Sequence, residues 1–88
     1  MMAKDAQKKE GARAYVLIEG TAGRIHKILE EIRKIPEVES CDAVTGQYDI
    51  IAVINAKDLN SVAQVSYAKI QMIEGVLRTI TCNVINIL

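Results

Sequence analysis

The chain is poor in the residue types on which catalytic and metal sites depend. Its 88 residues include one histidine, two cysteines and three tyrosines, and no tryptophan or phenylalanine. The sequence contains no Gly-rich phosphate-binding loop, no Ser/His/Asp set and no cluster of metal ligands. We therefore expect a protein that is not an enzyme and that binds neither a metal nor another cofactor.

Cysteines and long apolar runs are equally scarce. Cys41 and Cys82 are too isolated to form a Cys-X-X-Cys redox pair or a zinc cluster, and each lies in an apolar, strand-like segment. No run of about 18 apolar residues exists, and the polar N-terminus lacks the apolar segment of a signal peptide. These absences predict reduced core thiols in a cytoplasmic protein that neither spans a membrane nor is exported.

Charge is balanced, with 11 basic and 11 acidic residues, and half of the chain is apolar. This length and composition are typical of one small globular domain with a thin core, and such domains often gain stability by oligomerising. Residues 1–13 are mostly polar and show no apolar period. We expect them to form a flexible tail before a single domain over residues 14–88.

The first half of this domain alternates between strand and helix patterns. Residues 15–18 form a short apolar run typical of a strand. A helix follows, which Thr21 can cap and Pro36 ends. Its apolar side chains recur at spacings of three and four residues: Ile25, Ile28, Leu29, Ile32 and Ile35. Residues 38–45 and 50–55 both have strand patterns.

The second half continues with a helix and a strand. Apolar residues recur at helical spacing from Leu59 to Ile73, with Asp58 placed to cap this helix and Gly75 placed to end it. The last segment, residues 76–88, alternates as a strand. One of its faces carries Ile80, Cys82 and Val84, and the other carries Thr79, Thr81 and Asn83.

The order strand, helix, strand, strand, helix, strand is that of the ferredoxin-like α+β fold, an antiparallel four-stranded sheet with both helices on one face. The strand over residues 50–55 is apolar on both sides, with Ile50, Ala52 and Ile54 on one and Ile51 and Val53 on the other. Because the helices cover only one face, we expect a second copy, related by a two-fold axis, on the other. The Thr/Asn side of the last strand would lie in or beside that interface.

A turn at residues 46–49 joins the two middle strands. Gly46 can adopt a positive φ, and Asp49 can bind backbone amides or an ammonium group. Taken alone, such a segment is typical of a hairpin turn. We expect the turn and the Thr/Asn side of the last strand to meet at the subunit boundary, which predicts a small-ligand site there.

A resemblance to a known family is carried by five segments in order: residues 14–18, 35–38, 44–49, 74–76 and 78–81. They are similar to the effector-binding domain of the Lrp/AsnC (leucine-responsive, feast/famine) transcription regulators, also called the RAM domain. The resemblance covers residues 12 to 88. It implies a ferredoxin-like βαββαβ domain that dimerises through its sheets and assembles further into octameric or similar rings.

The resemblance also implies that an amino acid or related effector binds between subunits. By matching position, the ligand-binding residues would be Thr45, Gly46, Tyr48, Asp49, Thr79 and Thr81. Asp49 would offer a counter-charge to an α-ammonium group, amides around Gly46 would receive a carboxylate, and Tyr48 would wall the ligand side chain. Threonines are also ordinary strand residues, and Tyr48 is equally suited to interface packing.

The chain departs from the family at its N-terminus. Full-length members carry a helix-turn-helix domain, whereas only a polar tail precedes the first strand here. We expect a stand-alone effector domain without direct DNA binding, because the net charge is zero and a recognition helix is lacking. Any role in transcription would then run through co-assembly with full-length regulators.

Two other interpretations remain open. The two-sided apolar sheet also suits a purely structural oligomerisation module, which would respond to no amino acid. The same element order occurs in small enzymes built as dimeric ferredoxin-like barrels. Few catalytic side chains are available for that role, since we expect His26 to be a solvated residue on the outer face of the first helix.

Overall fold

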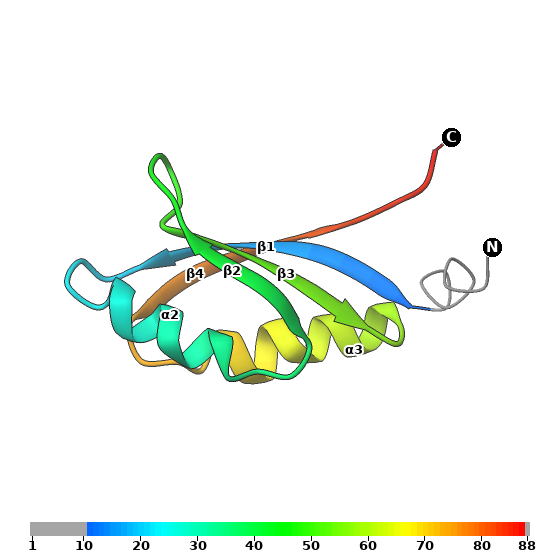
Figure 1. Ribbon diagram of the computed structural model, residues 1–88, viewed down its shortest axis with the longest axis horizontal. Helices are drawn as coiled ribbons and strands as arrows, with labels where there is room; N and C mark the ends of the chain where they lie inside the picture. Colours follow the sequence, from blue (N-terminus) through cyan, green and yellow to red (C-terminus); the bar gives the residue numbers. More distant parts are fainter. Residues whose placement is uncertain (1–10, 88) are drawn as a thin grey trace.

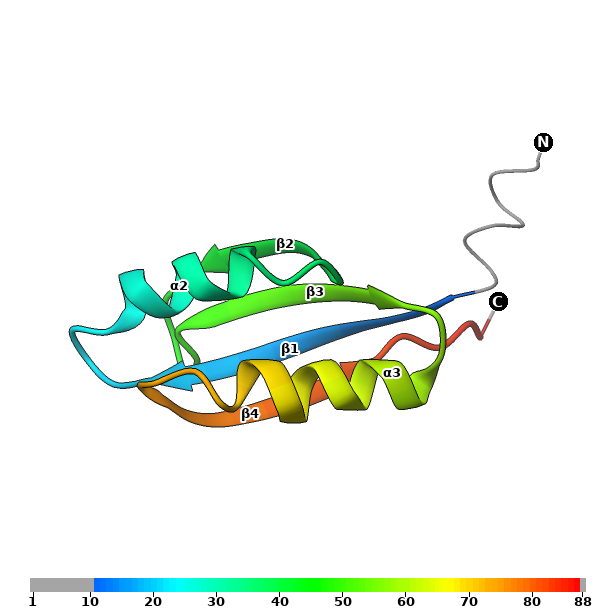
Figure 2. The ribbon, with the colours of Figure 1, turned by 90° about the horizontal axis from the view of Figure 1, so that it is seen from below.

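The computed structural model describes residues 11–87 as a four-stranded antiparallel sheet with its helices on one face (Figures 1 and 2). The strands lie in the order β2-β3-β1-β4. The elements are β1 (Ala12–Gly20), α2 (Ile25–Arg33), β2 (Val38–Ala43), β3 (Ile50–Ala56), α3 (Leu59–Gln64), its continuation η1 (Val65–Ile70) and β4 (Val76–Asn83). The predicted ferredoxin-like α+β fold is confirmed.

The boundaries differ slightly from those predicted. Strand β1 begins at Ala12, so two residues of the predicted tail belong to the sheet, while residues 1–10 of that tail lie outside the described part of the chain. Strand β4 ends at Asn83, although the Val84 N–H still donates to the Arg13 carbonyl at 2.8 Å. Pairing with β1 thus persists one step beyond the assigned strand.

The core lies between the sheet and the helices and is mainly isoleucine. Figure 2 shows α2 over β2 and β3, and α3 with its continuation η1 along the other half of the sheet, where α3 packs on β1 and β3 and η1 on β4. Alternate residues of the two central strands point toward the helices and are buried. The largest fully buried side chains are Val16, Ile18, Ile28, Ile32, Ile50, Ile54, Val62 and Ile70. The predicted stripe of the first helix is therefore confirmed, because its central members Ile28 and Ile32 are completely covered.

Thr21 does not cap the first helix as predicted. The N-cap residue is Arg24, which makes no capping hydrogen bond through its side chain. Thr21 instead donates its N–H and its hydroxyl to the Gly75 carbonyl, at 2.8 and 3.1 Å. The two residues between Thr21 and the N-cap include Gly23 at φ 89°, and this turn carries the threonine away from the helix start.

The second helix contains a feature that the sequence did not predict. After Gln64 the chain continues as a π-helix, and the Gln71 N–H donates to the Ser66 carbonyl, five residues back, at 3.0 Å. Ser66 lies at 5% exposure on the inner side of this segment. A π-helical turn inside a longer helix often occurs near a functional site.

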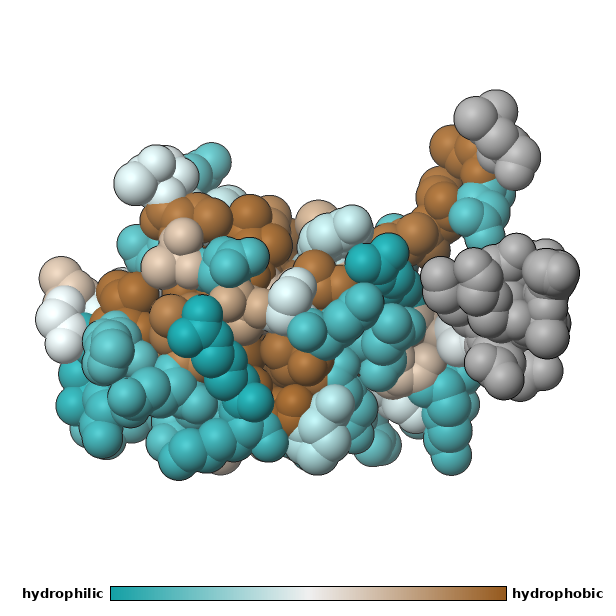
Figure 3. Space-filling view, viewed as in Figure 1, coloured by the Kyte–Doolittle hydropathy of each residue, from teal (hydrophilic) through white to brown (hydrophobic). Residues whose placement is uncertain are grey.

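The face of the sheet opposite the helices has no cover. It carries six apolar side chains that we call the open face: Tyr15, Leu17, Ile51, Val53, Ile80 and Cys82. Each is half-buried or exposed, with Tyr15 at 40% and Ile80 at 39% exposure. In Figure 3 hydrophobic side chains show on the upper side, away from the helices, and along the C-terminal segment. The two-sided apolar pattern of β3 thus corresponds to a buried side and an uncovered side.

Strand β4 faces the opposite way from the prediction. Its register with β1 places Thr79, Thr81 and Asn83 on the helix side and Ile80 and Cys82 on the open face. The Thr/Asn side is thus not in the uncovered face of the sheet. Cys41 is a buried thiol as predicted, but Cys82 is exposed and is not a core residue of the single chain.

Within residues 11–87 the helices are all too short and too polar to cross a bilayer.

The cap of the second helix yields a pH-dependent prediction. Asp58 caps as predicted, its Oδ1 accepting the Ser61 N–H at 2.7 Å, and this bond lowers the pKa of the carboxyl below its ordinary value of 3.8. Since the folded-state pKa is the lower one, the stabilisation is present above the unfolded pKa and is lost as pH falls through the folded pKa. We expect Asp58→Ala to melt at a lower temperature than wild type at pH 7, and this difference to shrink under strongly acidic conditions.

Thermal unfolding of wild type and Asp58→Ala, followed by circular dichroism at pH 7 and under strongly acidic conditions, checks this prediction. Asp58→Asn is the matched control, because asparagine retains a capping oxygen and should melt close to wild type at pH 7. Equal melting temperatures for Asp58→Ala and wild type at pH 7 would contradict the assigned cap.

Candidate functional site

The turn between β2 and β3 is held by hydrogen bonds to the end of β1. The Asp49 N–H donates to the Ile18 carbonyl at 2.9 Å, and Asp49 Oδ2 accepts the Gly20 N–H at 2.9 Å. The Asp49 carbonyl accepts the Val44 N–H at 2.8 Å and closes the turn. Asp49 therefore fixes the position of the turn, with one of its carboxylate oxygens in use.

Gly46 forms the tip of this turn. Its φ is 120°, a backbone conformation that side chains with a Cβ rarely adopt. A Cβ there would meet no atom within 4 Å, so glycine is required for the backbone angle and not for space within the single chain. Thr45, beside it, is also exposed.

Figure 1 shows that the turn rises on the side of the sheet away from the helices. Tyr48 there is half-buried, and the Arg78 guanidinium lies 5.7 Å from the centre of its ring. Arg78 Nη2 is 3.4 Å from the Tyr48 hydroxyl, and Arg78 Nε is 3.4 Å from Glu19 Oε1. We call Glu19, Tyr48, Asp49 and Arg78 the turn cluster. It places two carboxylates, a guanidinium and a phenol at one end of the open face.

Sequence reasoning missed two members of this cluster, Glu19 and Arg78. The strands that carry them are far apart in the chain, and only the β1–β4 register makes the two residues direct partners. Glu19 and Arg78 carry opposite charges, and oppositely charged cross-strand pairs are favourable. This charge pair could have been found from the sequence only if the β1–β4 register had been known.

Thr79 and Thr81 lie on the other side of β4. Thr79 Oγ1 accepts from Gln71 Nε2 at 2.8 Å, and Thr81 Oγ1 donates to Ser66 Oγ at 3.1 Å. A groove of about 270 Å³ runs between η1 and β4 over these contacts. Its lining residues, which we call the hydroxyl groove, are Leu59, Val62, Ala63, Ser66, Tyr67, Gln71, Thr81 and Asn83. Val62 and Ser66 are its buried lining residues, and its exposed lining residues are both polar and apolar.

The predicted site residues therefore form two groups within one chain. Thr45, Gly46, Tyr48 and Asp49 lie together at the turn, above the open face. Thr79 and Thr81 lie on the opposite side of the sheet, which faces η1. The expectation that both groups meet at one boundary is not met in the single chain, because the polar side of β4 hydrogen-bonds to η1 and its apolar side faces outward.

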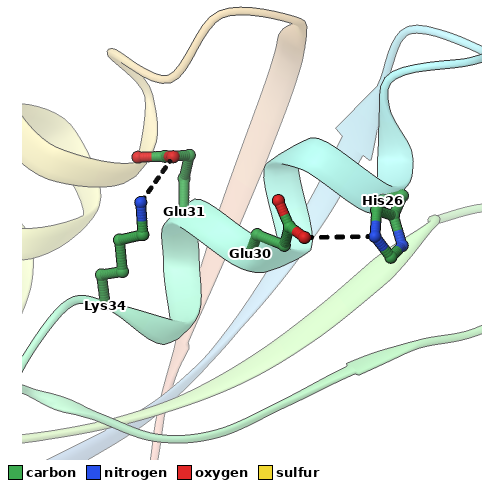
Figure 4. A network of polar contacts seen from close by, with 4 residues as sticks. All are labelled: His26, Glu30, Glu31 and Lys34. Atoms are coloured by element: carbon green, nitrogen blue, oxygen red, sulfur yellow. Dashed lines mark hydrogen bonds and ion pairs between the residues drawn. The ribbon is translucent and has the colours of Figure 1, made fainter.

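The single histidine makes only a surface contact. Figure 4 shows His26 Nε2 facing Glu30 Oε2, at 3.2 Å, and Lys34 Nζ facing Glu31 Oε2, at 3.1 Å, along the outer face of α2. The His26 side chain is 85% exposed. Among residues 11–87, no group of three or more His, Cys, Asp or Glu side chains is arranged to hold a metal ion.

Comparisons with known proteins point to one family of transcription regulators. The profile of the Lrp/AsnC ligand-binding domain matches residues 13–88. An uncharacterised helix-turn-helix-type transcriptional regulator of Pyrococcus abyssi is 29% identical over 68 residues, which are 77% of this chain and 43% of that protein. The chain thus spans less than half the length of this curated relative.

Solved structures agree with this assignment. A protein of Thermus thermophilus has a TM-score of 0.83 and 32% identity, over 88% of this chain and 96% of its own. A transcriptional regulator of Neisseria meningitidis, solved as a complex with L-Met, has a TM-score of 0.80 and 22% identity, over 98% of this chain and 56% of its own. The second likeness establishes a shared fold. From the profile match over residues 13–88, this chain belongs to the Lrp/AsnC ligand-binding domain family.

Proposed function

We propose that the chain is an oligomeric, non-catalytic module that binds an amino acid or a related small effector. The observation that carries the proposal is the turn cluster, in which opposite charges and an aromatic ring are held at the end of an uncovered apolar face. Hydrogen bonds between β1 and Asp49 fix the position of the turn before any ligand arrives. The L-Met complex of the Neisseria meningitidis regulator, a protein of the same fold, supports this class of ligand.

A second copy of the chain is the partner that best suits the open face. Monomeric proteins rarely leave a contiguous apolar patch of this kind uncovered. The patch has charged groups at both ends, the pair Arg13–Glu39 at one and Glu19–Arg78 at the other. An apolar centre with a polar rim is the usual composition of a protein interface, and a two-fold axis would cover both copies at once.

Oligomerisation would also complete the ligand site. The turn cluster lies at the margin of the open face, so a neighbouring chain would wall it off from solvent. Thr45 and Gly46 are exposed at the tip of the turn and are available to such a neighbour. Thr79 and Thr81 would join the same site if a further chain placed the helix side of its β4 against the turn. Assembly of dimers into an octamer or similar ring would provide such a chain.

The family relation supports a role in transcription control. The Pyrococcus abyssi relative is a helix-turn-helix-type transcriptional regulator, and this chain matches less than half of its length. Full-length Lrp/AsnC regulators that share this domain would be natural partners for co-assembly, since the same open face would pair in both. The module itself would make no direct contact with DNA.

A purely structural oligomerisation module is the second candidate. It is favoured by the hydrogen bond from the Gly20 N–H, which gives the Asp49 carboxylate a role in the fold without any ligand. The two candidates differ in one respect only, which is a response to small molecules.

A thermal-shift panel against the proteinogenic L-amino acids at millimolar concentration separates them. An amino acid present at 100 times its dissociation constant should stabilise the folded assembly by about 2.7 kcal/mol. We expect a selective shift with one or a few amino acids. An absence of any shift across the panel would favour the structural module.

Asp49→Asn tests the turn within the same panel. Asparagine can still accept the Gly20 N–H through its side-chain oxygen but carries no charge, so we expect the variant to fold and oligomerise normally while losing the ligand-induced shift. Size-exclusion chromatography with light scattering is the control for assembly. If Asp49→Asn shows the same ligand-induced shift in melting temperature as wild type, the Asp49 charge takes no part in ligand binding.

The two thiols report on the open face. Burial raises the pKa of Cys41 to about 11, which leaves it a protonated, slowly reacting thiol near neutral pH, whereas Cys82 is exposed in the single chain. If a second copy covers the open face, Cys82 should react slowly with a disulfide reagent at high protein concentration and quickly after dilution dissociates the assembly. Cys82→Ser identifies the reacting thiol. Rapid labelling of Cys82 in the intact oligomer would contradict the proposed interface.

A further inference from the structure

Arg78 connects three parts of the molecule at the turn cluster. It starts near the beginning of β4, pairs with Glu19 across the β1–β4 ladder, and reaches the ring of Tyr48 in the turn between β2 and β3. Its side chain is 55% exposed. The guanidinium therefore contacts side chains from β1 and from the turn, while most of the Arg78 side chain remains open to solvent.

The contacts that hold Arg78 are weak ones. Its Nε–Glu19 and Nη2–Tyr48 distances are both 3.4 Å, whereas strong charge-assisted hydrogen bonds measure about 2.7–2.9 Å. An exposed ion pair of this kind contributes little to stability. A ligand that offers a better anion can replace these contacts at small cost, and the planar guanidinium is suited to bind a carboxylate through two parallel hydrogen bonds.

The charges around Arg78 match a dipolar ligand. Glu19 places a negative charge in contact with Arg78, and Asp49 adds a second carboxylate on the turn that carries Tyr48, where it accepts the Gly20 N–H. A free α-amino acid carries an ammonium group and a carboxylate a few bond lengths apart, with its side chain free to lie against the Tyr48 ring. A simple amine would leave the guanidinium without a partner, and a dicarboxylate would face the two acidic residues.

We infer that Arg78 binds the α-carboxylate of the effector and that the site therefore selects free α-amino acids over ligands with a blocked carboxyl group. This inference rests on the proposed function and assigns the group within the turn cluster that recognises the ligand's carboxyl end. Glu19, released from Arg78 when the ligand enters, then faces the ammonium group together with Asp49. The backbone amides around Gly46 are left to the neighbouring chain or to solvent.

The chain contains a matched control for this residue. Arg13, at the other end of the open face, lies 5.9 Å from the centre of the Tyr15 ring and 3.5 Å from Glu39. It repeats the arginine, tyrosine and glutamate combination at the opposite end of β1 from the turn that carries Asp49. If both arginines served only as charged residues at the rim of the interface, Arg78→Gln and Arg13→Gln would change ligand affinity equally.

The experiment compares wild type, Arg78→Gln and Arg13→Gln against each proteinogenic L-amino acid and its carboxamide, using calorimetric titration and thermal shift. For every amino acid that binds wild type, we expect Arg78→Gln to lose affinity by at least about tenfold, since a hydrogen-bonded charge is removed. Arg13→Gln should bind as wild type does. The carboxamides should bind weakly, and equally weakly to wild type and Arg78→Gln, because the group that Arg78 recognises is absent from them.

Several outcomes would overturn the inference. The inference fails if Arg78→Gln binds amino acids as tightly as wild type, or if Arg78→Gln and Arg13→Gln lose affinity equally. Arg78 would then be an interface residue only, and the proposed function would stand. Carboxamides that bind wild type as tightly as the free amino acids would lead to the same conclusion, and this comparison needs no variant, so it decides the matter even if Arg78→Gln folds poorly. If no amino acid binds wild type, the proposed function fails and this inference fails with it.

Discussion

The architecture depends on one constraint, which is that the central strands β1 and β3 are apolar on both faces while the helices cover only one. The helix side is filled by isoleucine and valine from both strands, and it forms a closed core. On the opposite side, the same two strands carry the half-buried Leu17, Ile51 and Val53 and the exposed Tyr15. Small domains of this length have thin cores, so an uncovered apolar sheet is a large fraction of what they can bury. The proposed association through the open face would therefore bury apolar surface that folding of the single chain leaves exposed.

That constraint also determines where chemistry can occur. Polar groups surround the apolar side chains of the open face, at its ends and along the edge strand β2, where Ser40 and Asp42 pair with Val53 and Ile51. The charged turn cluster therefore lies at a margin and not at the centre. The threonines of β4 are directed to the other face, where Gln71 and Ser66 hydrogen-bond to Thr79 and Thr81. Each face thus carries one polar site at its edge, and neither is enclosed by a single chain. In the proposed assembly, residues of more than one copy would enclose the ligand.

The element order and the core were predictable because they depend on local periodicity. The stripe of the first helix and the cap at Asp58 are examples, since spacing and residue type alone specify them. The direction of β4 was not predictable in this way, because alternation separates two faces without saying which one is inward. Here the inward side is the polar one, and it is stabilised by side chains from a π-helical turn that no sequence pattern indicated. The turn was found from its glycine and aspartate, whereas Glu19 and Arg78 join it only through long-range strand register.

The loop that follows β1 joins the two sides of the molecule through consecutive amides. The Gly20 N–H is held by Asp49, which belongs to the turn above the open face, and the next N–H, that of Thr21, is held by the Gly75 carbonyl just before β4. Hydrogen exchange at these two neighbouring amides consequently reports two separate opening motions, release of the turn for Gly20 and separation of the start of β4 for Thr21. A molecule that slows exchange at one amide and not at the other would reveal which side of the sheet it holds, without any need to see it bound.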